Sequence, residues 1–560
     1  MKVAVVDGYV DEPSCLGVPP YVSPYPRYIR GMLKALKIPS AYFTAEKVRE
    51  NPAILRKFDL SIVIAGAVVP GKYLNAKPLS LYEVSTLPGE KVVVGGIALE
   101  LDKNERERLN VLDFPFEHEL FSTLKTLCRL SGNSAEFDID KFAILGSDVV
   151  LEHPDFPHII CEIETYRGCY WRKCSFCMER LHGMPAMRRP EMVIKEIKAL
   201  YKLGVRHFRL GRQTDFFTYL SSDLPFWNAG DGEKVGEKLD TLKDPEKPPE
   251  PNPEKMRAFH ELLWRECPEI KTLHLDNVNP RTVAAYPEES KEIIKTVVEL
   301  QTPGNVAAMG LESADPVVCR KNNLSSTVEE VEFAVRLINE YGRKRGWNGM
   351  PAFLPGINFV IGLDGESKRT FELNYEFLKK LLEKDLLLRR INIRQVKVLR
   401  HTPLYSKKEE IERRLRKHRK YFLKFKKRVR EEIDREMLRR MLPAGTMLRE
   451  VRCEVCDRGI TFGRQFGSYP LLVGIIGKYE RNEYLDVRVV GYGMRSVTAI
   501  PPVRLSEADV RVIEAIPGIG KNLARKIAGA RAMGLSEEEL RELLRKEAGE
   551  EFKRIERFLC

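Results

Sequence analysis

The sequence predicts an α/β protein of several domains, followed by a β-rich segment and a helical segment. Three observations support this prediction. Strand-like and helix-like stretches alternate over most of the chain, 448–500 shows short strand-like runs with glycine turns and no helical period, and the remaining residues return to helix. Alternation of strands and helices is typical of parallel sheets, and a run of short strands predicts a small closed barrel.

The first segment, residues 1–145, is predicted to form a Rossmann-like domain. Apolar strand-like runs occupy 2–6, 60–66 and 91–96, and 25–36 has helical spacing. Because strands joined through helices pair side by side in one direction, we expect a parallel sheet here.

Residues 155–405 are predicted to form a full or partial (β/α) barrel. Six strand-like runs alternate with helical patterns, at 158–166, 205–211, 271–277, 305–313, 356–363 and 391–399. Such barrels gather their active-site residues at the carboxyl ends of the strands. Residues 221–256 interrupt the pattern with proline, glycine and acidic residues, which predicts a surface insertion or lid.

The charge of the chain indicates a polyanionic partner or a generally basic surface. The net charge is +13, and residues 407–441 alone hold 16 Lys and Arg against 7 Asp and Glu. We expect 406–442 to be a basic helical linker, with either a solvated face or a nucleic-acid contact.

The composition also bears on location. The start of the chain has no signal-peptide pattern, and no apolar run is long enough to span a bilayer. The 11 cysteines indicate reduced thiols, metal ligands or catalysis rather than disulfides. We therefore expect a cytoplasmic protein without a membrane partner.

The segment "RGCYWRKCSFCMER" places Cys169, Cys174 and Cys177 within nine residues. Thiolates are the usual ligands of iron–sulfur clusters, and a cluster with three protein thiolates leaves one iron open. Two alternatives remain at this point: a zinc site with His182 as fourth ligand, and a plant-type ferredoxin site, which needs a fourth cysteine that is missing at short range here.

With these cysteines, residues 155–405 resemble the radical SAM superfamily. In that family three cysteines hold a 4Fe–4S cluster, and the amino and carboxylate groups of S-adenosylmethionine (SAM) chelate the fourth iron. One electron then cleaves the sulfonium to give a 5′-deoxyadenosyl radical. The resemblance implies an enzyme with these two cofactors and an electron donor as partner. The commonest family spacing has three residues, not four, between the first two cysteines.

The resemblance also implies a set of SAM contacts at strand ends. An aromatic residue and the strand segment "GINFVIGL" would meet adenine, "LGRQTDFFTY" would receive the methionine amino group, and "GLESADPVV" would lie near the ribose or carboxylate. The implied cofactor-binding residues are Phe176, Gly211, Gln213, Glu312, Ser313, Gly356 and Ile361. Gln213 stands where the family more often has Glu. The sequence singles out no general base, so the catalytic residues stay unknown.

Both ends of the chain carry further resemblances. Residues 7–33 are similar to a degenerate cobalamin-binding-type domain that lacks the Asp-x-His-x-x-Gly motif, and 443–502 resemble the TRAM domain, a small RNA-binding barrel. The order of domains resembles that of tRNA methylthiotransferases. Those enzymes hold a second cluster on three N-terminal cysteines, whereas the first 160 residues here contain only Cys15 and Cys128.

A second cysteine motif lies in the β-rich segment. Cys453 and Cys456 form a Cys-x2-Cys pair, which is either incidental or half of a metal or redox site.

The last segment, 503–560, contains a match to the helix-hairpin-helix pattern in "IEAIPGIGKNLARKIAGAR". The backbone N–H groups at the start of the second helix can receive a phosphate. The implied nucleic-acid contacts are Gly518, Gly520, Lys521 and Arg525. A hairpin that docks on protein is the alternative.

The whole order resembles archaeal radical SAM proteins with a C-terminal helix-hairpin-helix. We therefore expect a radical SAM enzyme that modifies RNA, with tRNA as the expected RNA. The alternatives are a radical SAM methyltransferase or other radical enzyme on a small molecule or protein, and a non-catalytic nucleic-acid-binding Fe–S or zinc protein.

Overall fold

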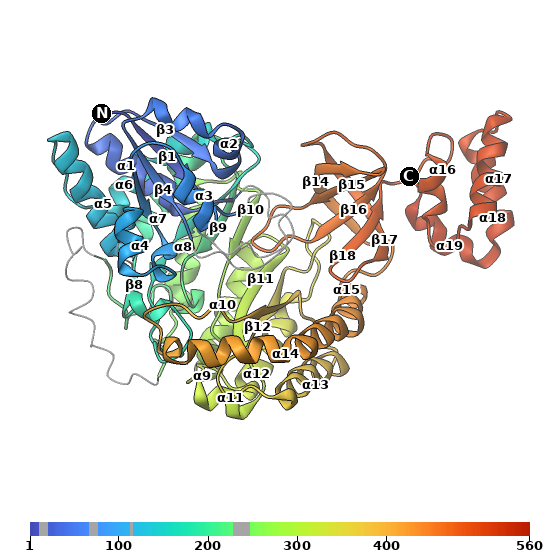
Figure 1. Cartoon of the computed structure of the whole chain (residues 1–560). Coiled ribbons are helices and arrows are strands. Elements are labelled where there is room, and N and C mark those ends of the chain that lie inside the picture. Colours follow the sequence, from blue (N-terminus) through green and yellow to red (C-terminus); the bar gives the residue numbers. More distant parts are fainter. Residues whose placement is uncertain (10–20, 67–76, 113–115, 228–246) are drawn as a thin grey trace.

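The N-terminal part contains a four-stranded parallel sheet. The structure is a computed structural model, and it describes residues 1–9, 21–66, 77–112, 116–227 and 247–560 (Figure 1). The strands run in the order β3-β1-β4-β5 and are β1 (Val3–Asp7), β3 (Ser40–Thr44), β4 (Leu60–Ile64) and β5 (Lys91–Val94). The helices of this part are α1 (Pro24–Ala35), α2 (Ala45–Glu50), α3 (Leu81–Thr86), α4 (Lys103–Arg108), α5 (Phe116–Ser131) and α6 (Ile139–Leu145).

The central part is a partial barrel of six parallel strands, so the structure decides between the full and the partial barrel. The strands are β6 (Ile160–Glu164), β9 (His207–Gly211), β10 (Thr272–Leu275), β11 (Asn305–Glu312), β12 (Phe353–Ile361) and β13 (Arg390–Gln395). A bridge from Asn277 to Ala308 joins the two halves of the sheet. A short strand from the N-terminal part, β2 (Tyr21–Val22), extends it beside β6. Among the described residues, no pairing closes the circle between β13 and β2.

Helices connect and cover these strands. They are α7 (Pro190–Lys202), α8 (Pro253–Glu266), α9 (Pro280–Ala285), α10 (Pro287–Leu300), α11 (Pro316–Lys321), α12 (Val328–Gly342) and α13 (Lys368–Glu383). Helix α12 shows how the sequence sets a boundary: Glu330 N donates to Thr327 Oγ1 and Thr327 N donates to Glu330 Oε2, a capping box. Every residue of β6 and β9 is buried, as expected for parallel strands covered on both faces. Part of the predicted lid, 228–246, lies outside the described residues.

A buried network of charged groups joins the N-terminal part to the barrel. Glu196 of α7 accepts from Arg27 Nε of α1 at 2.8 Å and from Arg188 Nη1 at 2.6 Å. Tyr28 donates to Glu164 of β6 at 2.8 Å. These side chains are almost fully buried, so each charge depends on its partner, and the two parts form one unit.

A long helix leads from the barrel to the C-terminal segments. It consists of α14 (Lys408–Arg428), a π-helical turn (Val429–Asp434) and α15 (Arg435–Met441). In Figure 1 it runs along the lower edge of the barrel. None of the described helices is both long and apolar enough to cross a membrane.

The β-rich segment forms a closed five-stranded barrel. Its strands, in the order β14-β15-β16-β18-β17, are β14 (Met447–Asp457), β15 (Ile460–Arg464), β16 (Leu472–Ile476), β17 (Tyr484–Tyr492) and β18 (Ser496–Ile500). Only the pair β16–β18 is parallel, which is the Greek-key order of OB-type barrels.

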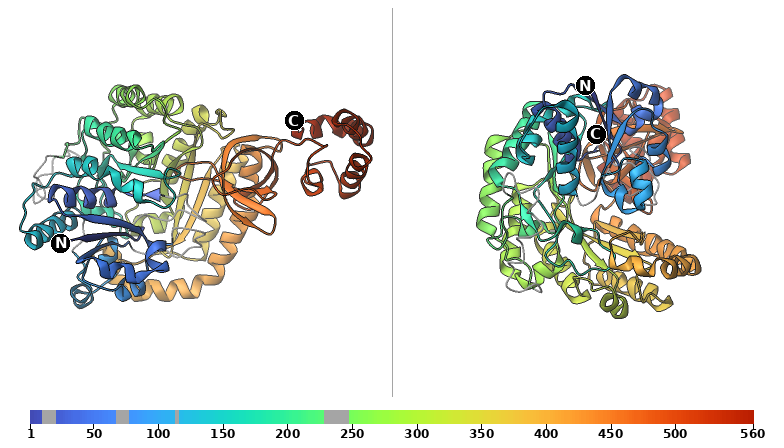
Figure 2. Two further views of the ribbon diagram at one scale, coloured as in Figure 1. Left: turned by 90° about the horizontal axis from the view of Figure 1, so that it is seen from above. Right: turned by 60° about the vertical axis from the view of Figure 1, so that its left-hand side comes forward.

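The chain ends in a small helical unit with its own core. It contains α16 (Val510–Glu514), α17 (Lys521–Ala532), α18 (Glu537–Ala548) and α19 (Phe552–Ile555). Figure 2 shows this unit beyond the five-stranded barrel, away from the rest of the molecule.

Candidate active site at the strand ends

The loop that contains Cys169, Cys174 and Cys177, called the cysteine loop below, follows β6. A short strand pair holds the base of this loop. The pair is β7 (Tyr166–Arg167) with β8 (Ala186–Met187). Thr214 Oγ1 donates to Gly168 O at 3.0 Å, and Cys169 N donates to Gly183 O at 3.2 Å. Gly168 has φ +94°, and a Cβ there would lie 2.7 Å from the carbonyl oxygen of Met184, so only glycine fits.

The far side of the loop is tied to the segment after α11. Ser175 donates through its N to Asn322 O at 3.0 Å and through Oγ to Asn322 Oδ1 at 2.7 Å. Trp171 Nε1 donates to Asn323 O at 2.7 Å, and Leu404 N donates to Ser175 O at 2.9 Å. The cysteines are thus held in place by backbone and side-chain bonds that do not use their sulfurs.

The three thiols are half-buried and close enough to influence one another. Burial is the main cause that raises the pKa of Cys169, Cys174 and Cys177. The neighbouring cysteines add to the rise for Cys174 and Cys177. Three thiolates here therefore need adjacent positive charge, which the irons of a cluster provide.

The zinc and ferredoxin alternatives fit this geometry less well. In the described part of the chain, no three His, Cys, Asp or Glu side chains converge closely enough to hold a single metal ion. A four-iron cluster separates its ligands more widely than one zinc ion does. Cys161 packs in the main core, where burial raises its pKa to about 12, so it is no fourth ligand.

The end of β9 offers an acceptor for a bound amino group. Gln213 is buried, its Nε2 donates to Leu210 O at 3.0 Å, and within the described residues its Oε1 has no hydrogen-bond partner. An orphaned buried acceptor suits the protonated amino group of SAM. A Cβ on Gly211 would lie 2.2 Å from Glu162 Oε1, so this position excludes a side chain.

The end of β11 brings a carboxylate beside the cysteine loop. Glu312 has φ +61° at a bulge of β11, and its charge raises the pKa of Cys174. Phe176 is half-buried against the apolar cluster that contains Leu363 and Val396, at the ends of β12 and β13. Phe176, Gly211, Gln213 and Glu312 are therefore all at the carboxyl ends of the strands.

The other predicted contacts lie differently. Ser313 Oγ accepts from Asp315 N at 3.1 Å in the turn before α11. Ile361 ends β12, but its side chain is in the core and its carbonyl accepts from Val396 N at 2.7 Å. Gly356 lies mid-strand, about 16 Å before that end at 3.3 Å per residue. The structure does not bring Gly356 to the strand ends.

Sequence reasoning missed two residues near the loop. Asn322 accepts two hydrogen bonds from Ser175 of the cysteine loop. In the sequence, the polar run after α11 is the one feature that could have pointed to it. Asp215 is buried, which raises its pKa to about 6, and it accepts from Phe217 N and Asn279 N at 3.1 Å each. It anchors the turn beside Gln213.

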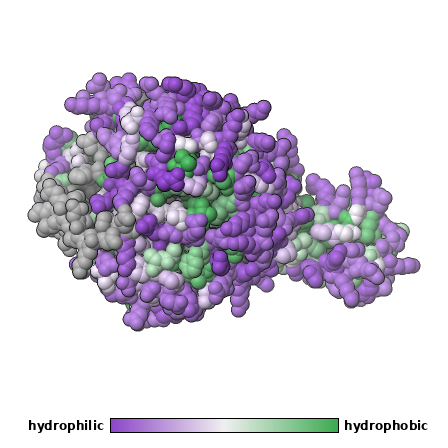
Figure 3. Space-filling model, turned by 90° about the horizontal axis from the view of Figure 1, so that it is seen from below, coloured by the Kyte–Doolittle hydropathy of each residue, from purple (hydrophilic) through white to green (hydrophobic). Residues whose placement is uncertain are grey.

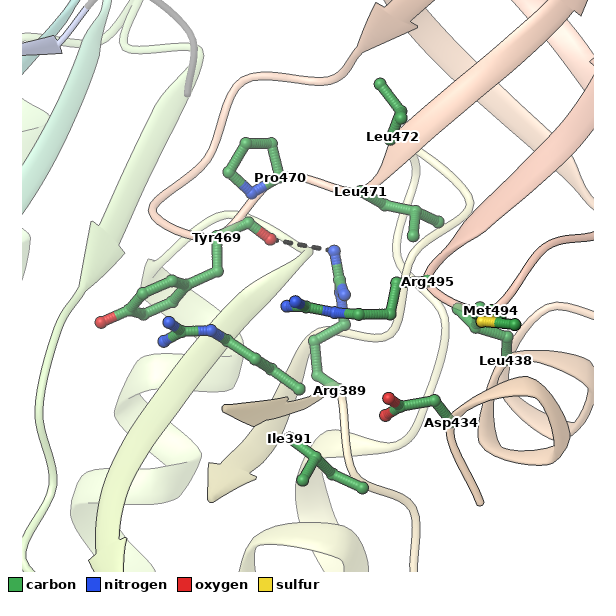
Figure 4. Close-up of a pocket in the computed structure, with 11 residues that line it drawn as sticks. Arg389, Ile391, Asp434, Leu438, Tyr469, Pro470, Leu471, Leu472, Met494 and Arg495 are labelled. Atoms are coloured by element: carbon green, nitrogen blue, oxygen red, sulfur yellow. Dashed lines mark hydrogen bonds between the residues drawn. The ribbon is translucent and has the colours of Figure 1, made fainter. Parts of the chain in front are cut away.

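The interior of the partial barrel receives a side chain from the five-stranded barrel. The connection between β15 and β16 brings Tyr469 against Val306 and Ala308 of β11. The Arg390 guanidinium lies 4.2 Å from the Tyr469 ring, and Arg389 donates to Tyr469 O at 2.9 Å (Figure 4). Ring stacking of Phe466 on His207, with centroids 3.8 Å apart, fastens the same connection.

The predicted nucleic-acid residues lie on one exposed turn. Gly518, Gly520, Lys521 and Arg525 are all exposed, at the turn between α16 and α17 and on the first turns of α17. Gly518 has φ +97°, and Gly520 caps α17 without a side chain, so the first N–H groups of this helix face solvent. They are far from the cysteine loop in the fold (Figure 1).

Comparisons with known proteins identify the family of the central part of the chain. The model of the radical SAM superfamily matches residues 163–378. An uncharacterized protein of Archaeoglobus fulgidus is 56% identical over 92% of this chain and 92% of its own, and one of Methanocaldococcus jannaschii is 42% identical over 89% and 92%.

Two solved structures are more distant in sequence. One is the radical SAM methyltransferase TsrM of Kitasatospora setae, which is 13% identical, has a TM-score of 0.44, and covers 72% of this chain and 74% of its own. The other is the cobalamin-dependent SAM radical enzyme OxsB, which is 15% identical, has a TM-score of 0.47, and covers 74% of this chain and 61% of its own.

A partial parallel barrel with three cysteines on the loop after its first strand defines a radical SAM enzyme. Residues 163–378 form a radical SAM domain, and the whole chain belongs to one family with these archaeal proteins. The superfamily uses a 4Fe–4S cluster and SAM, which confirms the predicted cofactors and the prediction of an enzyme.

Proposed function

We propose that this radical SAM enzyme modifies RNA, with tRNA as the expected substrate. When bound, the cluster and SAM supply the 5′-deoxyadenosyl radical. The residues of this chain would bind and orient these groups: the three cysteines would hold the cluster, Gln213 and Glu312 would bind the polar end of SAM, and Phe176 would offer an apolar surface to adenine.

The observation that carries the RNA proposal is the helical unit at the chain end. It has its own core, lies outside the catalytic barrel, and exposes a glycine turn with Lys521 and Arg525 beside free helix N–H groups. Such a turn suits the binding of a phosphate, and a phosphate contact does not discriminate between nucleotide sequences. The five-stranded barrel next to it has the strand order of OB-type nucleic-acid binders.

The test must spare the five-stranded barrel, because its β15–β16 connection fills the interior of the catalytic barrel. A chain that ends at Pro502 removes only the helical unit. We expect it to keep its iron and its release of 5′-deoxyadenosine, but to lose most of its affinity for tRNA. Nucleoside mass spectrometry of tRNA incubated with the full chain should show a modified nucleoside. Unchanged tRNA, with equal turnover of both chains, would contradict the proposal.

A second candidate is a radical methyltransferase or related enzyme acting on a small molecule. One contact favours it: Arg400 N, after β13, donates to Leu99 O at 3.0 Å, and Lys397 pairs with Glu100. The carboxyl ends of the N-terminal sheet and of the barrel therefore meet, which suits a ligand held between them. This candidate predicts that the chain ending at Pro502 turns over its substrate at the full rate.

A further inference from the structure

Helix α14 carries an exposed stripe of basic residues. It contains eleven Lys and Arg against three Glu, all three in its first turns, a surplus of eight within a chain of net charge +13. Five exposed or half-exposed side chains recur at helical spacing on one face: Arg413, Arg416, Lys417, Lys420 and Lys424. At 1.5 Å per residue this stripe is about 16 Å long.

The stripe faces away from the residues that pack α14 onto the barrel. Ile411 and Phe425 are buried, and Leu415 packs over Gly362 after β12. Arg414 donates to Leu363 O at 3.1 Å from the same packing side. The stripe residues lie roughly opposite, so the fold leaves them free to meet a partner. The face that carries α14 is largely hydrophilic (Figure 3).

These basic groups lack the acidic partners that some surface lysines have elsewhere in the chain. On α10, Lys291 and Lys295 pair with glutamates at 2.8 and 2.7 Å. In the part of the chain that the structure describes, no ion pair within 4.0 Å includes any of the five stripe residues. Like charges three and four residues apart destabilise a helix, and a polyanion would relieve that repulsion.

The stripe also lies between the two regions that the proposed function needs. Just before α14, Leu404 N donates to Ser175 O within the cysteine loop. Beyond its other end, Asp434 of the π-helical turn and Leu438 of α15 line one pocket together with Arg495 (Figure 4). Arg495 lies in the connection between β17 and β18, and the corresponding loop of OB-type barrels contacts oligonucleotides.

We propose that the exposed basic stripe of α14 is an RNA-binding surface along which the phosphate backbone runs from the β17–β18 connection to the cysteine loop. This inference rests on the proposed function and names the surface that brings RNA to the radical site. The apolar residues of α14 are mostly used in packing, so the surface suits phosphates better than a lipid bilayer, which would need an apolar face as well.

The test compares two triple variants of equal net charge. One is Arg416→Gln, Lys420→Gln and Lys424→Gln on α14. The other is Lys37→Gln, Arg56→Gln and Lys57→Gln, at exposed positions of the N-terminal part with no ion pair among the described residues. Glutamine is a good helix former at the three α14 positions, and the three control positions are exposed, so both variants should fold. The probes are fluorescent tRNA and a uridine 20-mer, titrated between 50 and 300 mM KCl.

We expect the control to match the wild type, and the α14 variant to bind at least tenfold more weakly at low salt. Its slope of log affinity against log salt should fall by about 2 to 3, because each lost phosphate contact removes about 0.7–0.9. Equal curves for the two variants would overturn the inference, as would binding of anionic phospholipid vesicles but not of RNA.

Separate measurements test the RNA-binding surface and the proposed RNA modification. Release of 5′-deoxyadenosine without RNA should be the same in both variants and the wild type. If the wild type modifies RNA and the α14 variant does so equally well, the surface is wrong. If RNA binds through α14 but no nucleoside changes, the surface stands and the proposed function falls.

Discussion

The hydroxyl of Tyr469, from the five-stranded barrel, donates to the carboxylate of Asp276 at the end of β10. Asp276 also pairs with Arg209 of β9 at 2.6 Å. Its neighbour Asn277 donates to Gln213 O at 3.0 Å. A chain of contacts thus connects a C-terminal domain to the residue expected to bind the amino group of SAM.

Replacing Tyr469 by phenylalanine should lower the free energy of unfolding by about 1–2 kcal/mol, because a buried carboxylate loses a donor. Denaturant titration measures this, and amide exchange should quicken in residues 465–471. The control is Tyr484→Phe, which removes a more exposed hydroxyl at 2.8 Å from His158 Nδ1 and should cost less than 0.5 kcal/mol. An equal loss of unfolding free energy in both variants would show that the hydrogen bond to Asp276 contributes no more to stability than an exposed one.

Serine in place of Cys169, Cys174 or Cys177 should abolish the cluster, since a hydroxyl is a far weaker ligand for iron than a thiolate. Iron content after anaerobic reconstitution and absorption near 400 nm are the measurements. Cys456→Ser is the matched control, because Cys456 is exposed on β14 and should be dispensable for iron. Full iron in any of the first three variants would remove that cysteine from the ligand set.

Gln213→Leu should weaken SAM binding about tenfold, which is the loss of one hydrogen bond to a charged group, about 1.4 kcal/mol. Gln213→Glu should preserve binding, because it restores the commoner family residue. Calorimetric titration of the reconstituted protein with SAM tests both, with iron content as the control for folding. Unchanged affinity in the leucine variant would exclude Gln213 as a contact.

Acid should loosen the connection between β15 and β16. Burial lowers the pKa of His207 to about 3 and of His274 to about 4, and these rings contact Phe466 and Ser468 N. Between the unfolded pKa near 6.5 and pH 4, the unfolded chain binds protons that the folded chain refuses. Stability is therefore lost as pH falls, by about 1.4 kcal/mol per unit for each histidine.

Buried carboxyls, among them those of Asp7 and Asp215, act in the opposite direction. Burial raises the pKa of Asp7 and of Asp215 to about 6, so the folded chain gains protons there first and stability rises as pH falls. The readout must be local: amide exchange of 464–471, corrected for its intrinsic rate, should accelerate from pH 6.5 to 5 more than that of α12. An equal acceleration of exchange in 464–471 and in α12 would contradict a local effect of the two histidines.

Much of the fold could be predicted from the sequence, because local patterns determine it. Apolar runs of 4 to 8 residues between helical stretches predict parallel strands, and the six runs of the barrel each correspond to a strand of the structure. The cysteine spacing likewise predicts a cluster site, since one short loop supplies all three expected protein ligands. The TRAM and helix-hairpin-helix assignments remain predictions.

The amino-acid sequence by itself determined the radical SAM class, because its three cysteines and strand-end motifs are contiguous segments whose chemistry follows from residue type and spacing. Only the tertiary structure decided that the described strands leave the barrel open, that Gly356 lies mid-strand, and that Tyr469 enters the barrel interior. The pairing of Tyr469 with Asp276 spans 193 residues, and no local pattern encodes which distant side chains packing will bring together.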